Sequence, residues 1–181
     1  SSKLIAKDMG SMMEDFDNFG TLGPKVMASV AVYTRQLGIE VKALTGMIDK
    51  FDDFEGAAQS ASKLAQSFGM NVDALKMMKE QDPAKRLSML QKQFAATGKS
   101  VENMSRQEMK LLASTAGLSD KAAKLAFSQK GLGMSYEDVQ AGAEEAKEKQ
   151  LTQAEALKKL SDTIKKVFGS GQKQFKGFFD A

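Results

Sequence analysis

Apolar residues recur along most of the chain at intervals of three and four positions, the spacing that marks one face of an α-helix. The first regular stripe contains Val26, Val30, Tyr33 and Leu37 and stops at Gly38. β-branched residues are sparse and never form a run, so the sequence gives little support to a β-sheet. The pattern predicts an all-α protein with several short helices. Its later apolar stripes are Ile39, Leu44, Ile48 and Phe51; Phe54, Ala57, Ala58, Ala61, Leu64, Ala65 and Phe68; Leu87, Leu90 and Phe94; Met109, Leu112, Ala113 and Ala116; and Ala123, Ala126 and Phe127.

Polar residues and glycines between the stripes predict where the helices begin and end. Asp53 is a candidate N-cap, and either Asn71 or Asp73 caps the short segment that follows. Asp82-Pro83 is a strong start signal, because an acceptor precedes a proline at the first helical position. The other predicted starts are Ser105 with Glu108, Ser119-Asp120 and Ser135, and the predicted stops are Gly38, Gly69, Gly98, Gly117 and the pair Gly131 and Gly133.

The first 25 residues are rich in methionine, glycine and phenylalanine. The chain starts with Ser1-Ser2-Lys3 and has no initiator methionine there, so we expect a fragment of a longer protein. Residues 19–24 are predicted to form a linker. Before this linker we expect a short amphipathic helix, whose apolar residues are Leu4, Ile5, Met9, Met12, Met13 and Phe16.

The C-terminal part of the chain is predicted to form one long helix over 139–168, because no breaker stronger than Gly142 interrupts it. A helix of this length would extend about 45 Å. Leu151 leaves the heptad frame of this helix. The residues that keep the 3-4-3 spacing of a coiled coil, and that we expect to mediate oligomerisation, are Leu157, Leu160, Ile164 and Val167.

These patterns together predict a bundle of short capped helices followed by a long C-terminal helix that forms a coiled coil. The chain divides into an N-terminal helix and linker over 1–25, a helical bundle over 26–133, and the long helix with its tail over 134–181. No apolar run approaches the length of about 18 residues that spans a bilayer.

The chain contains no histidine, no cysteine and no tryptophan. It therefore lacks the most frequent general base, the usual thiol nucleophile and the usual zinc ligands. Its acidic residues fall at helix starts or on polar faces, which favours solvated carboxylates over a catalytic pair. We expect a protein that is not an enzyme and that has no catalytic, cofactor-binding or metal-binding residues.

Twelve methionines are many for a chain of 181 residues. Flexible thioethers fill irregular gaps in a core, and this is the favoured interpretation. A binding groove lined by methionine is the alternative. The methionines that fall near apolar stripes of the bundle are Met77, Met78, Met89, Met104 and Met109.

Basic and aromatic residues alternate in the C-terminal tail. The formal charge of the chain is +3, and the six lysines and three acidic residues of 152–181 account for it. The tail is interpreted as a coiled-coil core with a solvated basic face, as a docking segment for a protein partner, or as a segment that inserts at a membrane surface. A weak contact with nucleic acid is a further alternative. The aromatic residues that would dock are Phe168, Phe175, Phe178 and Phe179.

The helices predicted over 105–116 and 119–128 are joined by Gly117-Leu118 and resemble a helix-turn-helix. The second helix carries Lys121 and Lys124 but no Arg, Asn or Gln near its start that could read base edges. The first 151 residues are also neutral overall. A DNA-binding role is therefore disfavoured at this point.

Residues 37–130 resemble segments of bacteriophage tail tape measure proteins. The resemblance includes no catalytic or metal motif. It rests on Leu37-Gly38-Ile39, Phe51-Asp52-Asp53-Phe54-Glu55, Ala61-Ser62-Lys63-Leu64-Ala65-Gln66-Ser67-Phe68-Gly69-Met70-Asn71-Val72-Asp73, Gln81-Asp82-Pro83-Ala84-Lys85-Arg86, Ser105-Arg106-Gln107-Glu108-Met109-Lys110-Leu111-Leu112-Ala113 and Gly117-Leu118-Ser119.

The resemblance implies a structural protein of the virion that is packed inside the phage tail and is present in the host cytoplasm during assembly. Such proteins set tail length, leave with the DNA, and contact the tail tube or the baseplate hub as symmetric oligomers, here expected to be trimers with hexamers as the alternative. Because 37–130 is broken into short helices, we expect a folded end of the protein and not its length-measuring rod. The competing hypothesis is a helical adaptor whose Phe/Lys tail docks onto a partner or a membrane.

Overall fold

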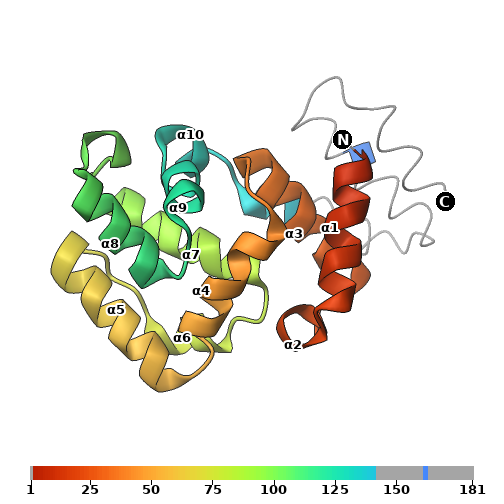
Figure 1. Cartoon of the computed structure of the whole chain (residues 1–181), viewed down its shortest axis with the longest axis horizontal. Helices are drawn as coiled ribbons and strands as arrows, with labels where there is room; N and C mark the ends of the chain where they lie inside the picture. The colour runs from red at the N-terminus through yellow and green to blue at the C-terminus, as the bar shows by residue number, and fades with distance from the viewer. Residues whose placement is uncertain (1, 142–160, 163–181) are drawn as a thin grey trace. The chain divides into compact units, whose positions relative to one another are not determined.

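A computed structural model describes residues 2–141 and 161–162 of the chain (Figure 1). These residues form α-helices, two short 3-10 helices and turns, and none of them lies in a β-strand. The all-α prediction is confirmed. Contacts along the chain define two compact units: unit 1 contains Ser1–Gln36 and Ser135–Ala181, and unit 2 contains Leu37–Met134.

The division between the units falls within α3 (Pro24–Leu37). Two side-chain contacts tie α3 to other parts of unit 1. Arg35 binds Asp8 of α1 (Ser2–Glu14) through two hydrogen bonds of 2.7 and 2.8 Å. The ring of Tyr33 lies 5.0 Å from that of Tyr136, and both rings are fully buried. Residues before and after unit 2 in the sequence therefore share one core.

The N-terminal helix of unit 1 is amphipathic, as predicted, but it ends at Glu14, before Phe16, and two of the residues predicted on its apolar face are exposed. Ile5 and Met12 are buried in α1, whereas Leu4 and Met13 are exposed. The predicted linker over 19–24 starts at the last residue of α2 (Phe16–Phe19) and ends at the first residue of α3.

Unit 2 is built around α7 (Pro83–Ala96), which buries residues on most of its circumference. Phe94 of this helix packs against Phe127 with ring centroids 5.2 Å apart. Figure 1 shows α5 and α6 side by side and α8 next to α9 in this unit. The other elements of unit 2 are η1 (Val41–Leu44), α4 (Thr45–Lys50), α5 (Phe54–Phe68), α6 (Ala74–Lys79), η2 (Val101–Asn103), α8 (Arg106–Ala116), α9 (Asp120–Ala126) and α10 (Gln129–Leu132).

The predicted helix starts of unit 2 are confirmed. Side chains of Asp53, Asp73 and Asp82 accept hydrogen bonds from the first-turn amides of α5, α6 and α7. Ser105 and Glu108 form the reciprocal capping box of α8. The glycines at 38, 69, 98 and 117 all have positive φ, between 72° and 85°, which places each in the left-handed conformation typical of a helix end.

Two boundary predictions in unit 2 are wrong. The single helix expected over 39–51 is a 3-10 helix followed by α4. The helix expected to run from Ser119 to Gly131 ends at Ala126, because Ser128 accepts a hydrogen bond from Gly131 N and starts α10. Gly131 is therefore buried inside α10, where a Cβ would lie 2.6 Å from the carbonyl oxygen of Ala126.

The predicted long C-terminal helix lies mostly outside the described residues. Residues 136–141 are helical, and the amide of Asp138 donates to the Ser135 hydroxyl at 3.3 Å, which confirms the predicted cap. Ser161 and Asp162 are also helical. In the part of the chain that the structure describes, no helix is long and apolar enough to cross a membrane.

Candidate functional site

The residues predicted from the sequence to mediate oligomerisation and docking lie outside the described part of the chain, so both assignments stay predictions. The oligomerisation residues are Leu157, Leu160, Ile164 and Val167, and the docking residues are Phe168, Phe175, Phe178 and Phe179.

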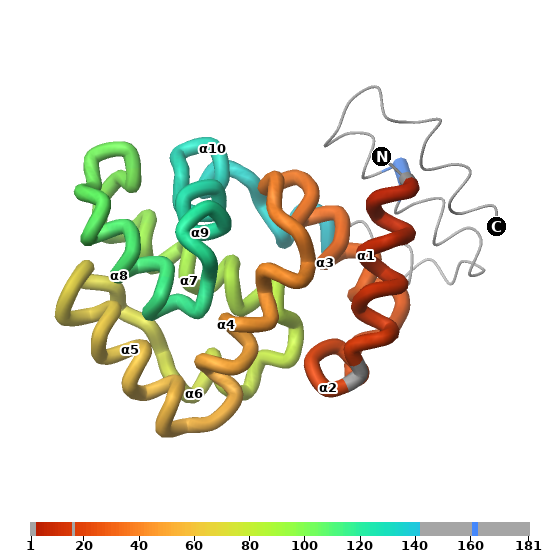
Figure 2. Tube along the Cα trace, viewed as in Figure 1, coloured from red at the N-terminus to blue at the C-terminus, as the bar shows by residue number. Residues whose placement is uncertain are grey.

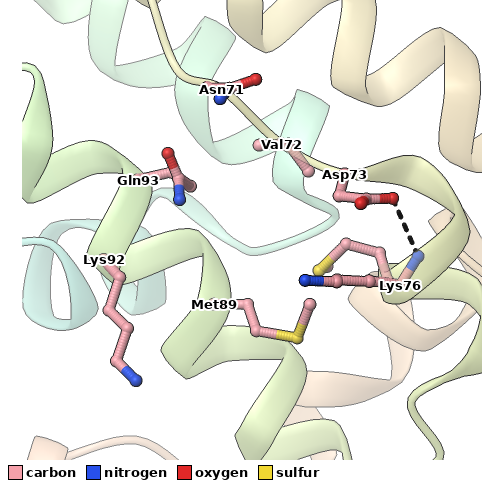
Figure 3. Close-up of a pocket in the computed structure, with 8 residues that line it drawn as sticks. Asn71, Val72, Asp73, Lys76, Met89, Lys92 and Gln93 are labelled. Atoms are coloured by element: carbon pink, nitrogen blue, oxygen red, sulfur yellow. Dashed lines mark hydrogen bonds between the residues drawn. The ribbon is translucent and has the colours of Figure 1, made fainter.

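A half-open pocket of about 470 Å³ lies in unit 2 between the segment that links α5 to α6 and one side of α7 (Figure 3). The linking segment and the first turn of α6 contribute one wall, and α7 contributes the other. The pocket is lined by Asn71, Val72, Asp73, Lys76, Met77, Met89, Lys92 and Gln93.

The side chains of this pocket combine two lysines with one aspartate, two amide groups and two thioethers, so its net charge is positive. The carboxylate of Asp73 caps α6 by accepting a hydrogen bond of 3.1 Å from the amide of Lys76. Met77 is fully buried, whereas Lys76 and Lys92 are exposed. A lining of this kind favours an acidic ligand with some apolar surface, since ammonium groups attract anions and thioethers adapt to apolar groups.

A groove lined by methionine is the less favoured of the two interpretations of the methionine content, and two of the five methionines near apolar stripes, Met77 and Met89, do line this pocket. The lysines and amides were missed. No sequence signal marks them, because the wall over 71–77 and the wall over 89–93 are brought together only by the packing of unit 2.

The most deeply buried cation in unit 2 is Arg86, which is 5% exposed. Its guanidinium donates to the carbonyl oxygen of Met78 at 2.9 Å and lies 3.5 Å from that of Ile48. These carbonyls belong to the last turns of α6 and α4, where a positive charge is favourable. Burial lowers the pKa of Arg86, and the negative charges of Asp52 and Glu80 oppose that effect.

Two further polar side chains of unit 2 also bind the ends of helices. The amide of Gln91 donates to the carbonyl oxygen of Ala126 at 2.8 Å, at the end of α9. The carboxylate of Glu102 accepts from the amide of Gln129 at 3.2 Å, at the start of α10. Hydrogen bonds from the hydroxyl of Ser100 and from backbone amides lower the pKa of Glu102. The buried side chains of Arg86 and Gln91 and the exposed side chain of Glu102 thus each connect their own element to the end of another helix.

Within residues 2–141 and 161–162, no group of acidic side chains is arranged to hold a metal ion. Comparison of the chain with protein-family models, curated proteins and solved structures found no match.

Proposed function

We propose that this chain is a structural, non-catalytic component of a phage tail, a folded helical portion of a tape measure protein that contacts the tail tube or the baseplate hub. The observation that carries the proposal is that buried polar side chains of unit 2 bind the main chain at helix ends. Arg86 and Gln91 are buried, and each binds a main-chain carbonyl at a helix end. Buried side chains bound in this way stabilise the packing of the helices, as expected of a structural protein.

The resemblance of 37–130 to tape measure segments supports the same proposal. The chain then belongs to the virion, and to the host cytoplasm while tails assemble. Unit 2 consists of short capped helices, so it suits a folded end that docks in the tail. Mass spectrometry of purified virions from the phage that encodes the chain should detect its peptides in tails, and their absence from tails would contradict the proposal.

Self-association through the heptad residues of 157–167 is part of this proposal. Light scattering on the full chain should give about three times the 19.6 kDa of one copy, or six times for a hexamer. Leu160→Asp with Ile164→Asp should give a monomer, because two charges would enter the apolar seam. Thr163→Asp is the matched control, since its position lies off the seam. A wild-type chain that stays monomeric at high micromolar concentration contradicts self-association.

A second candidate function is a helical binding module, and the pocket of unit 2 favours it. An acidic peptide is the chemical class that fits Lys76, Lys92 and the two methionines.

In the membrane version of this module, the C-terminal tail inserts at a membrane surface, and vesicle co-sedimentation tests this version. Binding that is lost in Phe178→Ala with Phe179→Ala would favour this module over the tail component.

A further inference from the structure

The helices α8 and α9 form a helix-turn-helix with a three-residue connection, whose path is visible in Figure 2. Gly117 begins the turn with a φ of 76°. The amide of Leu118 then donates to the carbonyl oxygen of Ala113 at 2.9 Å, and Ser119 caps α9 through a 3.1 Å bond from Ala122 N. Each residue of the turn therefore has a defined structural role.

The two helices bury apolar residues, most of them alanines, and expose basic ones. On the outer face of α8, Arg106 and Lys110 are four residues apart, and on that of α9, Lys121 and Lys124 are three apart. Each pair therefore lies along one side of its helix. The buried residues are Leu112, Ala113 and Ala116 in α8 and Ala122, Ala123 and Ala126 in α9.

The net positive charge of unit 2 resides in the segment from α8 to α10. This segment carries five basic residues and two acidic ones, whereas the rest of unit 2 carries nine of each. Of the two acidic residues, Glu108 is engaged in the capping box and Asp120 lies in the first turn of α9. Glu102, just before α8, exerts an attraction on Lys124. The basic residues are Arg106, Lys110, Lys121, Lys124 and Lys130.

We propose that the exposed faces of α8 and α9 bind the phosphate backbone of duplex DNA without reading its sequence. Lysine and arginine supply most of the affinity of proteins for DNA by neutralising phosphates. The side chains that most often make paired contacts with base edges are Arg on guanine and Asn or Gln on adenine, and α9, which begins with Asp120-Lys121-Ala122, contains none of these three. The lack of Arg, Asn and Gln near the start of this helix was one reason to disfavour a DNA-binding role. It argues only against binding that depends on the DNA sequence.

Fluorescence anisotropy of the full chain with a labelled duplex of arbitrary sequence tests this proposal. Lys121→Gln with Lys124→Gln should weaken binding at least about tenfold at 0.1 M salt and reduce the slope of log K against log salt by about 2, since each lost phosphate contact contributes about 0.9. Arg106→Gln with Lys110→Gln should act in the same way. Unrelated duplexes should bind with equal affinity.

The matched control is Lys63→Gln with Lys79→Gln, which removes two exposed charges of the same unit outside α8–α10 and should change affinity less than twofold. A second variant replaces the tail lysines at 165, 166, 173 and 176 with glutamine. Circular dichroism shows whether each variant is folded. The proposal is overturned if the α9 variant binds like wild type, if only the tail variant loses binding, or if anionic vesicles bind more tightly than duplex DNA and depend on the same lysines.

Discussion

The substitution Arg86→Met tests whether the buried guanidinium holds the helices of unit 2 together. Methionine preserves much of the unbranched, apolar stem of arginine and removes its charge and its donors. The change leaves the carbonyl oxygen of Met78 without the donor that binds it at 2.9 Å. It also removes the cation that faces Asp52 and Glu80.

The expected loss follows from those contacts. A hydrogen bond from a charged donor to a buried carbonyl contributes about 1.5–3 kcal/mol. The second contact, to the carbonyl of Ile48, measures 3.5 Å and adds little at that length. Relief of the desolvation of the guanidinium, whose Nε has no hydrogen-bond partner among the described residues, offsets part of the loss. We expect Arg86→Met to lower the free energy of unfolding by about 2 kcal/mol.

Urea unfolding followed by circular dichroism at 222 nm measures this loss. The chain has no tryptophan, and its two tyrosines, Tyr33 and Tyr136, both lie in unit 1. Tyrosine fluorescence therefore reports on unit 1 alone. A lower midpoint by circular dichroism with a smaller shift in tyrosine fluorescence is the expected result, because Arg86 belongs to unit 2.

The matched control is Lys85→Met in the same helix. Lys85 is half exposed, and its ammonium lies 3.6 Å from Glu80, so its removal should change stability by less than about 0.5 kcal/mol. An Arg86→Met variant as stable as wild type, or more stable, would refute the reasoning, since the buried charge would then cost as much as its hydrogen bond contributes.

Three further predictions concern turns and helix ends in unit 2. In thermal unfolding, Gly117→Ala should lower the free energy of unfolding by about 3 kcal/mol or more, because its φ is positive and its Cβ would lie 2.6 Å from the carbonyl carbon of Gly46. Gly69 also has a positive φ, but its Cβ would enter open space, so Gly69→Ala should cost about 1 kcal/mol. Gln91→Met should cost about 1–3 kcal/mol in urea unfolding, because the carbonyl at the end of α9 loses its donor. Folding lowers the pKa of Glu102 from 4.5. The carboxylate of Glu102 therefore stabilises the folded chain fully above pH 4.5, and this stabilisation is lost as the pH falls through the lower pKa of the folded state. Glu102→Gln should therefore be less stable than wild type at pH 7, and denaturation at a series of pH values should show the difference closing in acid.

Local signals in the sequence were sufficient to place most helix ends. Each works through atoms a few residues away, as when Asp53 accepts from the amide of Gly56 at 2.6 Å. One of the two failures came where a second local signal competes with the first. Ser128 restarts a helix that Gly131 was expected to end, and the buried position of Gly131 reflects a close approach to Ala126 that only the folded unit shows.

The candidate pocket and the hydrogen bonds that buried Arg86 and Gln91 make to helix ends could not be derived in the same way. Arg86 reaches a carbonyl 38 residues away, and Gln91 one that is 35 residues away. Contacts at these separations depend on how the helices pack, and a stripe of apolar residues shows which face is buried but not which helix it meets. Nothing in the sequence therefore distinguishes Arg86 from the other basic residues of unit 2.

The short helices of unit 2 bear on which part of a tape measure protein this chain would be. Helices α4, α6, α9 and α10 have four to seven residues, and isolated helices shorter than about 12–15 residues are marginal in water. Their stability must come mainly from burying apolar residues such as Met47 and Met77 against the rest of the unit, with helix caps and the hydrogen bonds of Arg86 and Gln91 adding to it, so the unit should unfold as one body. A continuous helix with as many residues as unit 2 would extend about 150 Å at 1.5 Å per residue, whereas a folded domain of about 100 residues has a radius of gyration near 13 Å. A segment that folds in this way adds little length for its residues, and it therefore suits the docked end of a tail protein better than its ruler.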